Sequence, residues 1–288
     1  MINDMLSSMM ERYNCQTPED YKNALKEILQ ELTLFALSKS NFYQKAAFYG
    51  GTALRIFYGL DRFSEDLDFS LKKPSEQFSL EKYIPLIQNE LEAYGFKLEV
   101  QEKTKSKNTA VQSGFVKGNT IIQMIRVFPD FPVKWLHRDE VVKVKFEIDT
   151  DPPEGASYEQ KFSLLPVPYA VTLYDKPSLF AGKMHAVLCR KWKSRSKGRD
   201  FYDYVWYLTT NTTLNIRHLQ KRMEQTKDLE SGKELTLDEL KSLLEERFRS
   251  IDFESAKQDV LPFIRDTEKL SLWSSDFFCA ITEQYLHT

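Results

Sequence analysis

The chain has 288 residues, of which 42% are hydrophobic, 13% aromatic and 28% charged, which excludes wholesale disorder and allows one large or two smaller globular domains. Forty basic residues stand against forty-two acidic ones, a formal charge of −2. This balance excludes a surface that is basic all over, as a general nucleic-acid coat would need, but it allows a local basic patch.

The first well-marked element is a helix over residues 17–38. Thr17 is a suitable N-cap, Pro18 suits the first helical position, and the acidic residues that follow suit the positive end of the helix dipole. Apolar residues then recur at helical spacing and predict a buried stripe: Leu25, Ile28, Leu29, Leu32 and Phe35.

The next segments indicate an α+β fold. Residues 46–49 form a short apolar run that ends at Gly50-Gly51 and leads into a helical pattern from Thr52 to Tyr58, so we expect strand, glycine turn and helix. Residues 66–70 alternate polar and apolar, as in a half-buried strand. A helix over 80–94 follows, with Ser79 as its N-cap and Gly95 just past its end.

Four closely spaced strand-like runs come next, and they predict an antiparallel meander: 96–103, 110–117, 120–128 and 141–149. The stretch 150–170 is rich in Pro, Gly, Ser and acidic residues, and we interpret it as a linker. Helical patterns then cover 177–193, 200–209, 215–228, 236–250 and, in pieces, 253–286, with Thr236 and Glu239 spaced as in a capping box.

This order predicts two domains. An α+β domain with N-terminal helices would occupy residues 1–155, and a mainly helical domain would occupy 156–288 and contribute Lys183 and Asp200 to the cleft.

The cysteine pattern and the absence of targeting segments indicate a cytoplasmic protein. Cys15, Cys189 and Cys279 are odd in number and far apart, so neither a disulfide framework nor a zinc knuckle is expected. The chain opens Met-Ile-Asn-Asp, without the pattern of a signal peptide, and holds no apolar run of about 18 residues that would span a membrane.

One group of residues combines features of a phosphate site and a metal site. Gly50-Gly51-Thr52 with Arg55 would let the backbone approach a phosphate at the start of a helix. Asp66 and Asp68 lie two apart on a strand, so both carboxylates face the same side, where they suit Mg²⁺. Taken separately, a tight turn and a solvated strand face are the more common explanations of these features; their combination favours the functional interpretation.

The strand 141–149 offers a third carboxylate on its polar face, either Glu147 or Asp149, and we choose Glu147. Solvent exposure of that face is the competing explanation.

A run of basic residues begins inside the helical pattern of 177–193: Lys183, Arg190, Lys191, Lys193, Arg195, Lys197 and Arg199. It indicates either a solvated helix end or a contact with phosphates or RNA. Lys183 differs from the others because it lies among apolar residues, which suits an inward-reaching charge.

Other common chemistries lack support in the sequence. The four histidines show no metal-ligand spacing and no partner pattern, and there is no nucleophile elbow, Walker sequence or dinucleotide fingerprint.

Four blocks of the sequence resemble the AbiEii family of nucleotidyltransferase-like toxins, which includes the MenT toxins. In order along the chain they are Phe48-Tyr-Gly-Gly-Thr-Ala-Leu-Arg55, Arg62-Phe-Ser-Glu-Asp-Leu-Asp-Phe69, Lys183, and Arg199-Asp-Phe-Tyr-Asp203. The resemblance covers about residues 40 to 210. It implies a polymerase-beta-like nucleotidyltransferase core with a mixed sheet, followed by a helical C-terminal region.

The resemblance also implies roles for individual residues. Gly50, Gly51 and Thr52 would hold the triphosphate with support from Arg55, while Asp66 and Asp68 would bind the metal. Lys183 would contact the nucleotide phosphates, and Asp200 would be the first aspartate of the last block, beside Arg199 and Asp203. The basic residues Lys193, Arg195 and Lys197 are then candidates for contact with RNA.

The activity implied is an Mg²⁺- or Mn²⁺-dependent transfer of a nucleotide from an NTP to an acceptor. In some members the acceptor is the 3′ end of tRNA, and its modification blocks translation; a cognate antitoxin counteracts the toxin. We expect a monomer. Two alternatives stay open at this point: a non-catalytic protein that binds an NTP or a partner on the same fold, and a metal-dependent RNase that uses the same acidic residues.

Overall fold

The computed structural model describes residues 2–103, 110–119, 137–190 and 197–288. The chain forms two compact units, each assembled from separate stretches of sequence. The first unit comprises Met1–Ala53, Ser64–Pro152 and Gln160–Leu173, and the second comprises Leu54–Phe63, Pro153–Glu159 and Tyr174–Thr288. The predicted domains, 1–155 and 156–288, have a single boundary. The first unit, in contrast, also contains Gln160–Leu173, and the second unit also contains Leu54–Phe63.

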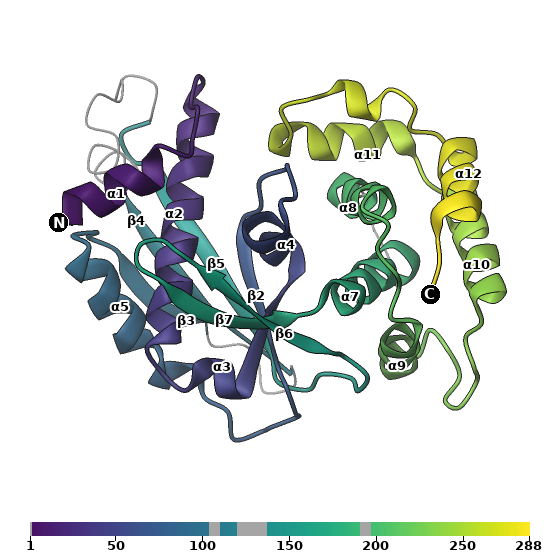
Figure 1. Cartoon of the computed structure of the whole chain (residues 1–288), viewed down its shortest axis with the longest axis horizontal. Coiled ribbons are helices and arrows are strands. Elements are labelled where there is room, and N and C mark those ends of the chain that lie inside the picture. Colours follow the sequence, from purple (N-terminus) through teal and green to yellow (C-terminus); the bar gives the residue numbers. More distant parts are fainter. Residues whose placement is uncertain (1, 104–109, 120–136, 191–196) are drawn as a thin grey trace. The chain divides into compact units, whose positions relative to one another are not determined.

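A mixed seven-stranded sheet forms the framework of the first unit (Figure 1). Its strand order is β3-β4-β5-β2-β1-β7-β6. The strands are β1 (Ala46–Tyr49), β2 (Asp66–Leu71), β3 (Glu99–Lys103), β4 (Val111–Asn119), β5 (Val141–Asp149), β6 (Tyr158–Ser163) and β7 (Tyr169–Tyr174). β3, β4 and β5 pair antiparallel, as the predicted meander requires, but β5 pairs parallel with β2. The α+β class with a mixed sheet is confirmed.

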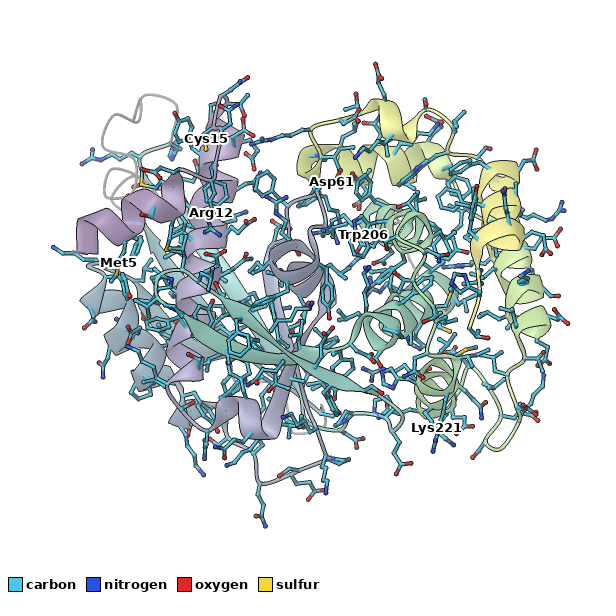
Figure 2. All side chains as sticks on the ribbon, in the orientation of Figure 1. Met5, Arg12, Cys15, Asp61, Trp206 and Lys221 are labelled. Carbon is cyan, nitrogen blue, oxygen red and sulfur yellow. The ribbon has the colours of Figure 1, made fainter. Side chains whose placement is uncertain are left out.

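Helices of the first unit pack against this sheet and against one another. They are α1 (Ile2–Met10), α2 (Pro18–Ser38), α3 (Phe42–Lys45), the start of α4 (Gly50–Tyr58), the short 3₁₀ turn η1 (Leu80–Lys82) and α5 (Ile84–Ala93). α2 packs against α5 and β5. Arg12, just past α1, forms a 2.6 Å ion pair with buried Glu31 of α2 (Figure 2).

The predicted helix over 17–38 is confirmed as α2. The Thr17 side chain accepts a hydrogen bond from the backbone N–H of Asp20, and the Asp20 carboxylate accepts one from the backbone N–H of Thr17. Two donors at the helix start are therefore satisfied. All five residues of the predicted apolar stripe are buried.

Three other expectations need correction. Residues 150–170 are not a linker, because they contain β6 and the start of β7. The helix expected over 80–94 is divided into η1 and α5, since Pro85 lacks an N–H and starts a new helix; Ser79 makes no side-chain cap. α4 begins at Gly50 itself, so the two glycines belong to its first turn. The strand expected at 120–128 lies outside the described residues.

Helices dominate the second unit. They are α7 (Lys176–Cys189), α8 (Gly198–Thr209), α9 (Ile216–Thr226), α10 (Leu237–Arg249), α11 (Phe253–Val260) and α12 (Ser275–Tyr285), with 3₁₀ turns η3 (Leu261–Phe263) and η4 (Glu268–Leu270). α8 packs against α7, α11 and α12. The core there is a cluster of contacting rings: Phe201, Tyr204, Phe248, Phe253 and Phe278. No helix in the described part of the chain is both long and apolar enough to cross a bilayer.

Candidate functional site

The acidic residues of β2 and β5 lie on neighbouring strands at matched positions. β2 and β5 run parallel, with Asp68 opposite Glu147 and Asp66 opposite Lys145. Side chains two residues apart on a strand share a face, and paired residues on adjacent strands share it too. Asp66, Asp68 and Glu147 therefore occupy the same face of the sheet, while Leu67 and Phe69 are buried on the other.

Glu147 and Asp149 are distinguished by their surroundings. Glu147 is next to Asp68 across the strands, whereas Asp149 is opposite Ser70, two residues further along. A carboxylate oxygen of Asp149 accepts a hydrogen bond from the backbone N–H of Asp151 at 3.0 Å, which uses it in the turn after β5. Of the two carboxylates, Glu147 is thus the one directly beside Asp68, and its role as a metal ligand stays a prediction.

The start of α4 lies directly against this acidic group. Gly50 has a φ of +84°, and a Cβ atom added there would stand 2.5 Å from Oδ2 of Asp68. Both the backbone conformation and the space thus require glycine. Thr52 is fully buried, and its hydroxyl donates a hydrogen bond to the backbone carbonyl of Asp66, which ties α4 to β2.

The chemistry of this donor set suits a hard divalent cation. Carboxylate oxygens are the ligands that Mg²⁺ and Mn²⁺ prefer, and Mg²⁺ sites in phosphoryl-transfer enzymes combine one or two carboxylates with substrate phosphates. Lys145 forms a 2.7 Å ion pair with Glu147, so part of the negative charge of the acidic group is already balanced.

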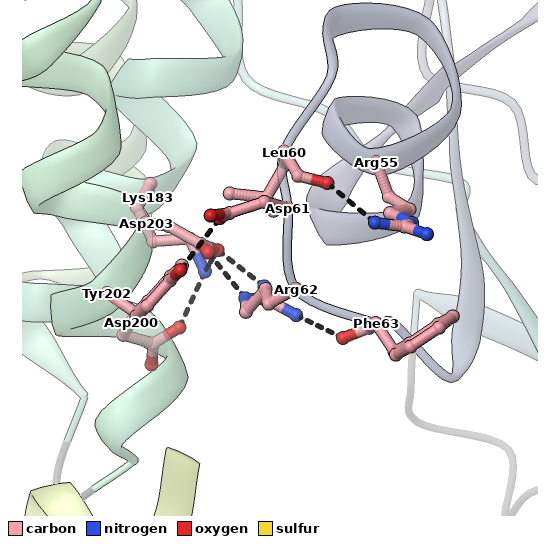
Figure 3. A network of polar contacts seen from close by, with 9 residues as sticks. All are labelled: Arg55, Leu60, Asp61, Arg62, Phe63, Lys183, Asp200, Tyr202 and Asp203. Atoms are coloured by element: carbon pink, nitrogen blue, oxygen red, sulfur yellow. Dashed lines mark hydrogen bonds and ion pairs between the residues drawn. The ribbon is translucent and has the colours of Figure 1, made fainter. Parts of the chain in front are cut away.

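A second group of charged residues lies in the second unit, and three of its members are buried: Arg62, Asp200 and Asp203 (Figure 3). Lys183 on α7 lies 2.7 Å from a carboxylate oxygen of Asp200 and 2.8 Å from one of Asp203, both on α8. Arg62 reaches the two oxygens of Asp203 through two nitrogens, each at 2.6 Å, and also donates to the carbonyl of Phe63. Arg190 contacts the other oxygen of Asp200 at 2.7 Å.

The electrostatics of this group favour the charged form of Asp200. Burial alone would raise the pKa of Asp200, but the charges of Lys183 and Arg190 outweigh it and hold that pKa below its usual value. Burial likewise works against the charge of Arg62, and the adjacent Asp203 more than compensates, so the pKa of Arg62 is raised. The network contains three cations and two anions, which leaves a surplus of positive charge.

Lys183 is inward-reaching, as its apolar neighbours predict: its side chain is 14% exposed. An ammonium group has three N–H donors, and two of them face Asp200 and Asp203.

Arg55, on α4, donates to the carbonyl of Leu60 at 3.2 Å, and its guanidinium lies 4.6 Å from the ring centre of Phe63. These contacts hold the side chain of Arg55 against the segment that follows α4.

The basic run after Lys183 is only partly within the described residues. Lys193 and Arg195 lie outside them. Lys197 is exposed and directly precedes α8. Arg190 pairs with Asp200, and the guanidinium of Arg199 lies 4.2 Å from the ring centre of Phe263, so both contact the protein itself.

Sequence reasoning missed two features of the second unit. The pairing of Arg62 with Asp203 was not expected, although both residues belong to the quoted blocks. The sequence analysis found no ligand spacing for the histidines, yet His185 lies beside Cys189 and Asp228, with their potential ligand atoms all within 4.8 Å of one another. The signal was the four-residue spacing of His185 and Cys189 on one helix.

A family model described as nucleotidyl transferase AbiEii toxin, Type IV TA system, matches residues 32–280. Two crystal structures from Helicobacter pylori are similar to this chain, one described as a proposed nucleotidyltransferase and the other as JHP933. Each is 17% identical with a TM-score of 0.48; the alignments cover 90% of this chain and 92% and 90% of those chains. No curated protein matches.

Proposed function

The chain belongs to the AbiEii family of nucleotidyl transferase toxins of type IV toxin–antitoxin systems, and from this premise we propose that it transfers a nucleotide from an NTP to an RNA acceptor. The family expected from the four sequence blocks is thereby confirmed. In this proposal, the mixed sheet of the first unit is the polymerase-beta-like core that the resemblance implies. The helices of the second unit are the C-terminal region.

The observation that carries the proposal is the alignment of Asp68 with Glu147, next to a glycine that no other residue can replace without a clash. We propose that Asp66, Asp68 and Glu147 hold Mg²⁺ or Mn²⁺, because their donor set fits such an ion. When bound, the metal would neutralise charge on the donor phosphates.

The glycines at the start of α4 would receive the triphosphate. A helix start presents backbone N–H groups and a partial positive charge to an anion, and the absence of side chains at Gly50 and Gly51 permits close approach. Because the hydroxyl of Thr52 is hydrogen-bonded to Asp66, we assign its part in nucleotide binding to its backbone N–H. Arg55 would support the phosphates from the same helix.

Lys183 is proposed to contact the nucleotide phosphates, and Asp200 to position it through their ion pair. The reaction is an in-line displacement: the 3′-hydroxyl of the acceptor forms a bond to the α-phosphorus, the bond to the bridging oxygen breaks, pyrophosphate leaves and the hydroxyl proton is released. Positioning and charge neutralisation would provide most of the rate acceleration.

The proposed acceptor rests on the family resemblance. We propose the 3′ end of tRNA, whose modification would block translation, and contact with RNA through Lys193, Arg195 and Lys197. A cognate antitoxin is the expected partner, and the protein is proposed to act as a cytoplasmic monomer.

The decisive experiment is to incubate purified protein with Mg²⁺, each of the four α-³²P-labelled NTPs and total cellular RNA. Labelled RNA that disappears with Asp68→Asn, but persists with Glu99→Gln, would support the proposal, since Glu99 is an exposed carboxylate on the same sheet. Label in protein would replace the RNA acceptor with a protein one.

Shortened RNA without label would support the nuclease alternative. Binding of NTP without any transfer would support the binding-protein alternative. Circular dichroism of both variants establishes that a lost activity is not caused by unfolding.

A further inference from the structure

A second candidate site on α7 uses none of the residues proposed above for nucleotide transfer. His185 and Cys189 are four residues apart on this helix, so both side chains project from the same face. Asp228, just after the end of α9, approaches that face. All three residues belong to the second unit.

The potential ligand atoms of these three residues lie close enough together to reach one metal ion after small side-chain movements. One potential ligand atom from each residue lies within 4.8 Å of the other two, and Nε2 of His185 is 3.7 Å from Oδ2 of Asp228. In a tetrahedral zinc site, with bonds of about 2.0–2.3 Å, ligand atoms are about 3.3–3.8 Å apart.

We propose that His185, Cys189 and Asp228 bind a transition-metal dication, with Zn²⁺ as the best fit. Imidazole and thiolate ligands select zinc over magnesium or calcium, which prefer oxygen alone. Two ligands at positions i and i+4 of a helix, completed by a third from another segment, form a recurrent arrangement in zinc proteins.

Neighbouring groups already orient two of the three ligands. The hydroxyl of Thr226 lies 3.0 Å from Nε2 of His185 and donates a hydrogen bond to a carboxylate oxygen of Asp228. Both contacts use the atoms that would bind the ion, Nε2 and Oδ2, so they hold these two atoms near each other without a metal and would be exchanged for bonds to the ion.

A cavity of about 360 Å³ gives access to the site. Cys189 and Asp228 both line it, together with Met223, Leu243 and Glu246. It leaves room for a water molecule as a fourth ligand. One thiolate and one carboxylate would balance the two positive charges of the ion, so the site tolerates the arginines around it: Arg190, Arg222 and Arg247.

The position of the site suggests a structural role. A bound ion would join the last turns of α7 to the segment after α9, close in sequence to Lys183 and Arg190. We therefore expect metal binding to stabilise the second unit. This inference does not depend on the proposed nucleotide transfer, and its test measures binding instead of catalysis.

The test uses the full chain, freed of metal with a chelator and kept reduced, and titrated with Co²⁺ as a spectroscopic substitute for Zn²⁺. We expect a thiolate-to-Co²⁺ charge-transfer band that saturates at one equivalent and is removed by Zn²⁺. Cys189→Ser should abolish the band, and His185→Gln and Asp228→Asn should each weaken metal binding by about tenfold or more.

Matched controls are Cys15→Ser, Cys279→Ser and His287→Gln, which should leave the titration unchanged. Zn²⁺ should also raise the melting temperature of the wild type but not of Cys189→Ser. A band that survives Cys189→Ser, or a wild type without any thiolate band, would overturn the proposal. Circular dichroism of each variant separates loss of a ligand from loss of the fold.

Discussion

Arg62 and Asp203 are 141 residues apart in sequence and form a two-pronged ion pair in which both side chains are almost completely buried. The pair connects the loop after α4 to α8 within the second unit. Two of the sequence blocks that indicate the family thus meet in one buried contact, which explains why arginine, with its fork of donors, occupies position 62.

This pair predicts a large loss of stability from Arg62→Ala. Removing one partner leaves Asp203 buried with Lys183 as its remaining cation, and the free energy of unfolding should fall by about 3 kcal/mol. Urea denaturation measures this change. The control is Lys269→Ala, which breaks the exposed pair with Asp61, one residue away from Arg62, and should cost less than about 1 kcal/mol. Equal effects of the two variants would argue against a buried pair.

A second prediction separates backbone strain from crowding at the acidic group. Gly50 and Gly59 both have positive φ, +84° and +80°, but only at Gly50 would a Cβ meet another group, the carboxylate of Asp68. Alanine at either position should cost about 1–2 kcal/mol of stability. Only Gly50→Ala should also displace Asp68 and lower nucleotide transfer, by about a hundredfold.

Measuring unfolding and transfer for both variants tests this distinction. If Gly59→Ala lowers transfer as much as Gly50→Ala does, the effect comes from strain in α4 and not from contact with Asp68.

The sequence predicted features that depend on local patterns. α2 was predictable because its cap and its apolar stripe lie within one short segment, and the inward direction of Lys183 followed from its apolar neighbours on one helix. β6 was missed because it is an edge strand with alternating exposed positions, and its polar residues resemble a loop.

Features that depend on long-range pairing could not be predicted in the same way. The register that sets Asp68 opposite Glu147 arises from parallel pairing of β2 and β5, which are separated by two other strands in sequence. The contact of Arg62 with Asp203 depends on the packing of a loop against α8. Charge patterns indicated candidate residues, but only the fold determines their partners.

A third prediction concerns the choice between Glu147 and Asp149. Glu147→Gln removes a carboxylate beside Asp68 and should raise the Mg²⁺ concentration for half-maximal transfer by about tenfold or more. Asp149→Asn retains an oxygen that can accept the hydrogen bond from Asp151, so it should have little effect. The reverse order of effects would move the third carboxylate to Asp149.

A fourth prediction addresses binding of RNA. Reversing the charges of Lys193 and Arg195 should weaken RNA binding and lower the slope of log affinity against log salt by about 1.5, because two phosphate contacts are lost. The control reverses Lys221 and Lys233, which lie outside the basic run and pair with nearby glutamates. An unchanged slope in the test variant would identify the run as a solvated surface.

The last prediction uses the lowered pKa of Asp200. Because this pKa is lower in the folded protein than the ordinary value of 3.8, the ionised carboxylate contributes stability at pH values above 3.8. That contribution is lost as the pH falls below 3.8 towards the pKa of the folded state. Thermal unfolding of the wild type should therefore show a steep fall in melting temperature in this acidic range.

Asp200→Asn should be less stable at neutral pH, since Lys183 and Arg190 lose their counter-charge, and its melting temperature should approach that of the wild type as the pH falls. Glu254→Gln, which changes an exposed carboxylate, should follow the wild-type curve throughout. If the difference between wild type and Asp200→Asn stays constant from neutral to acidic pH, the ion pairs of Asp200 do not contribute to stability through its charge.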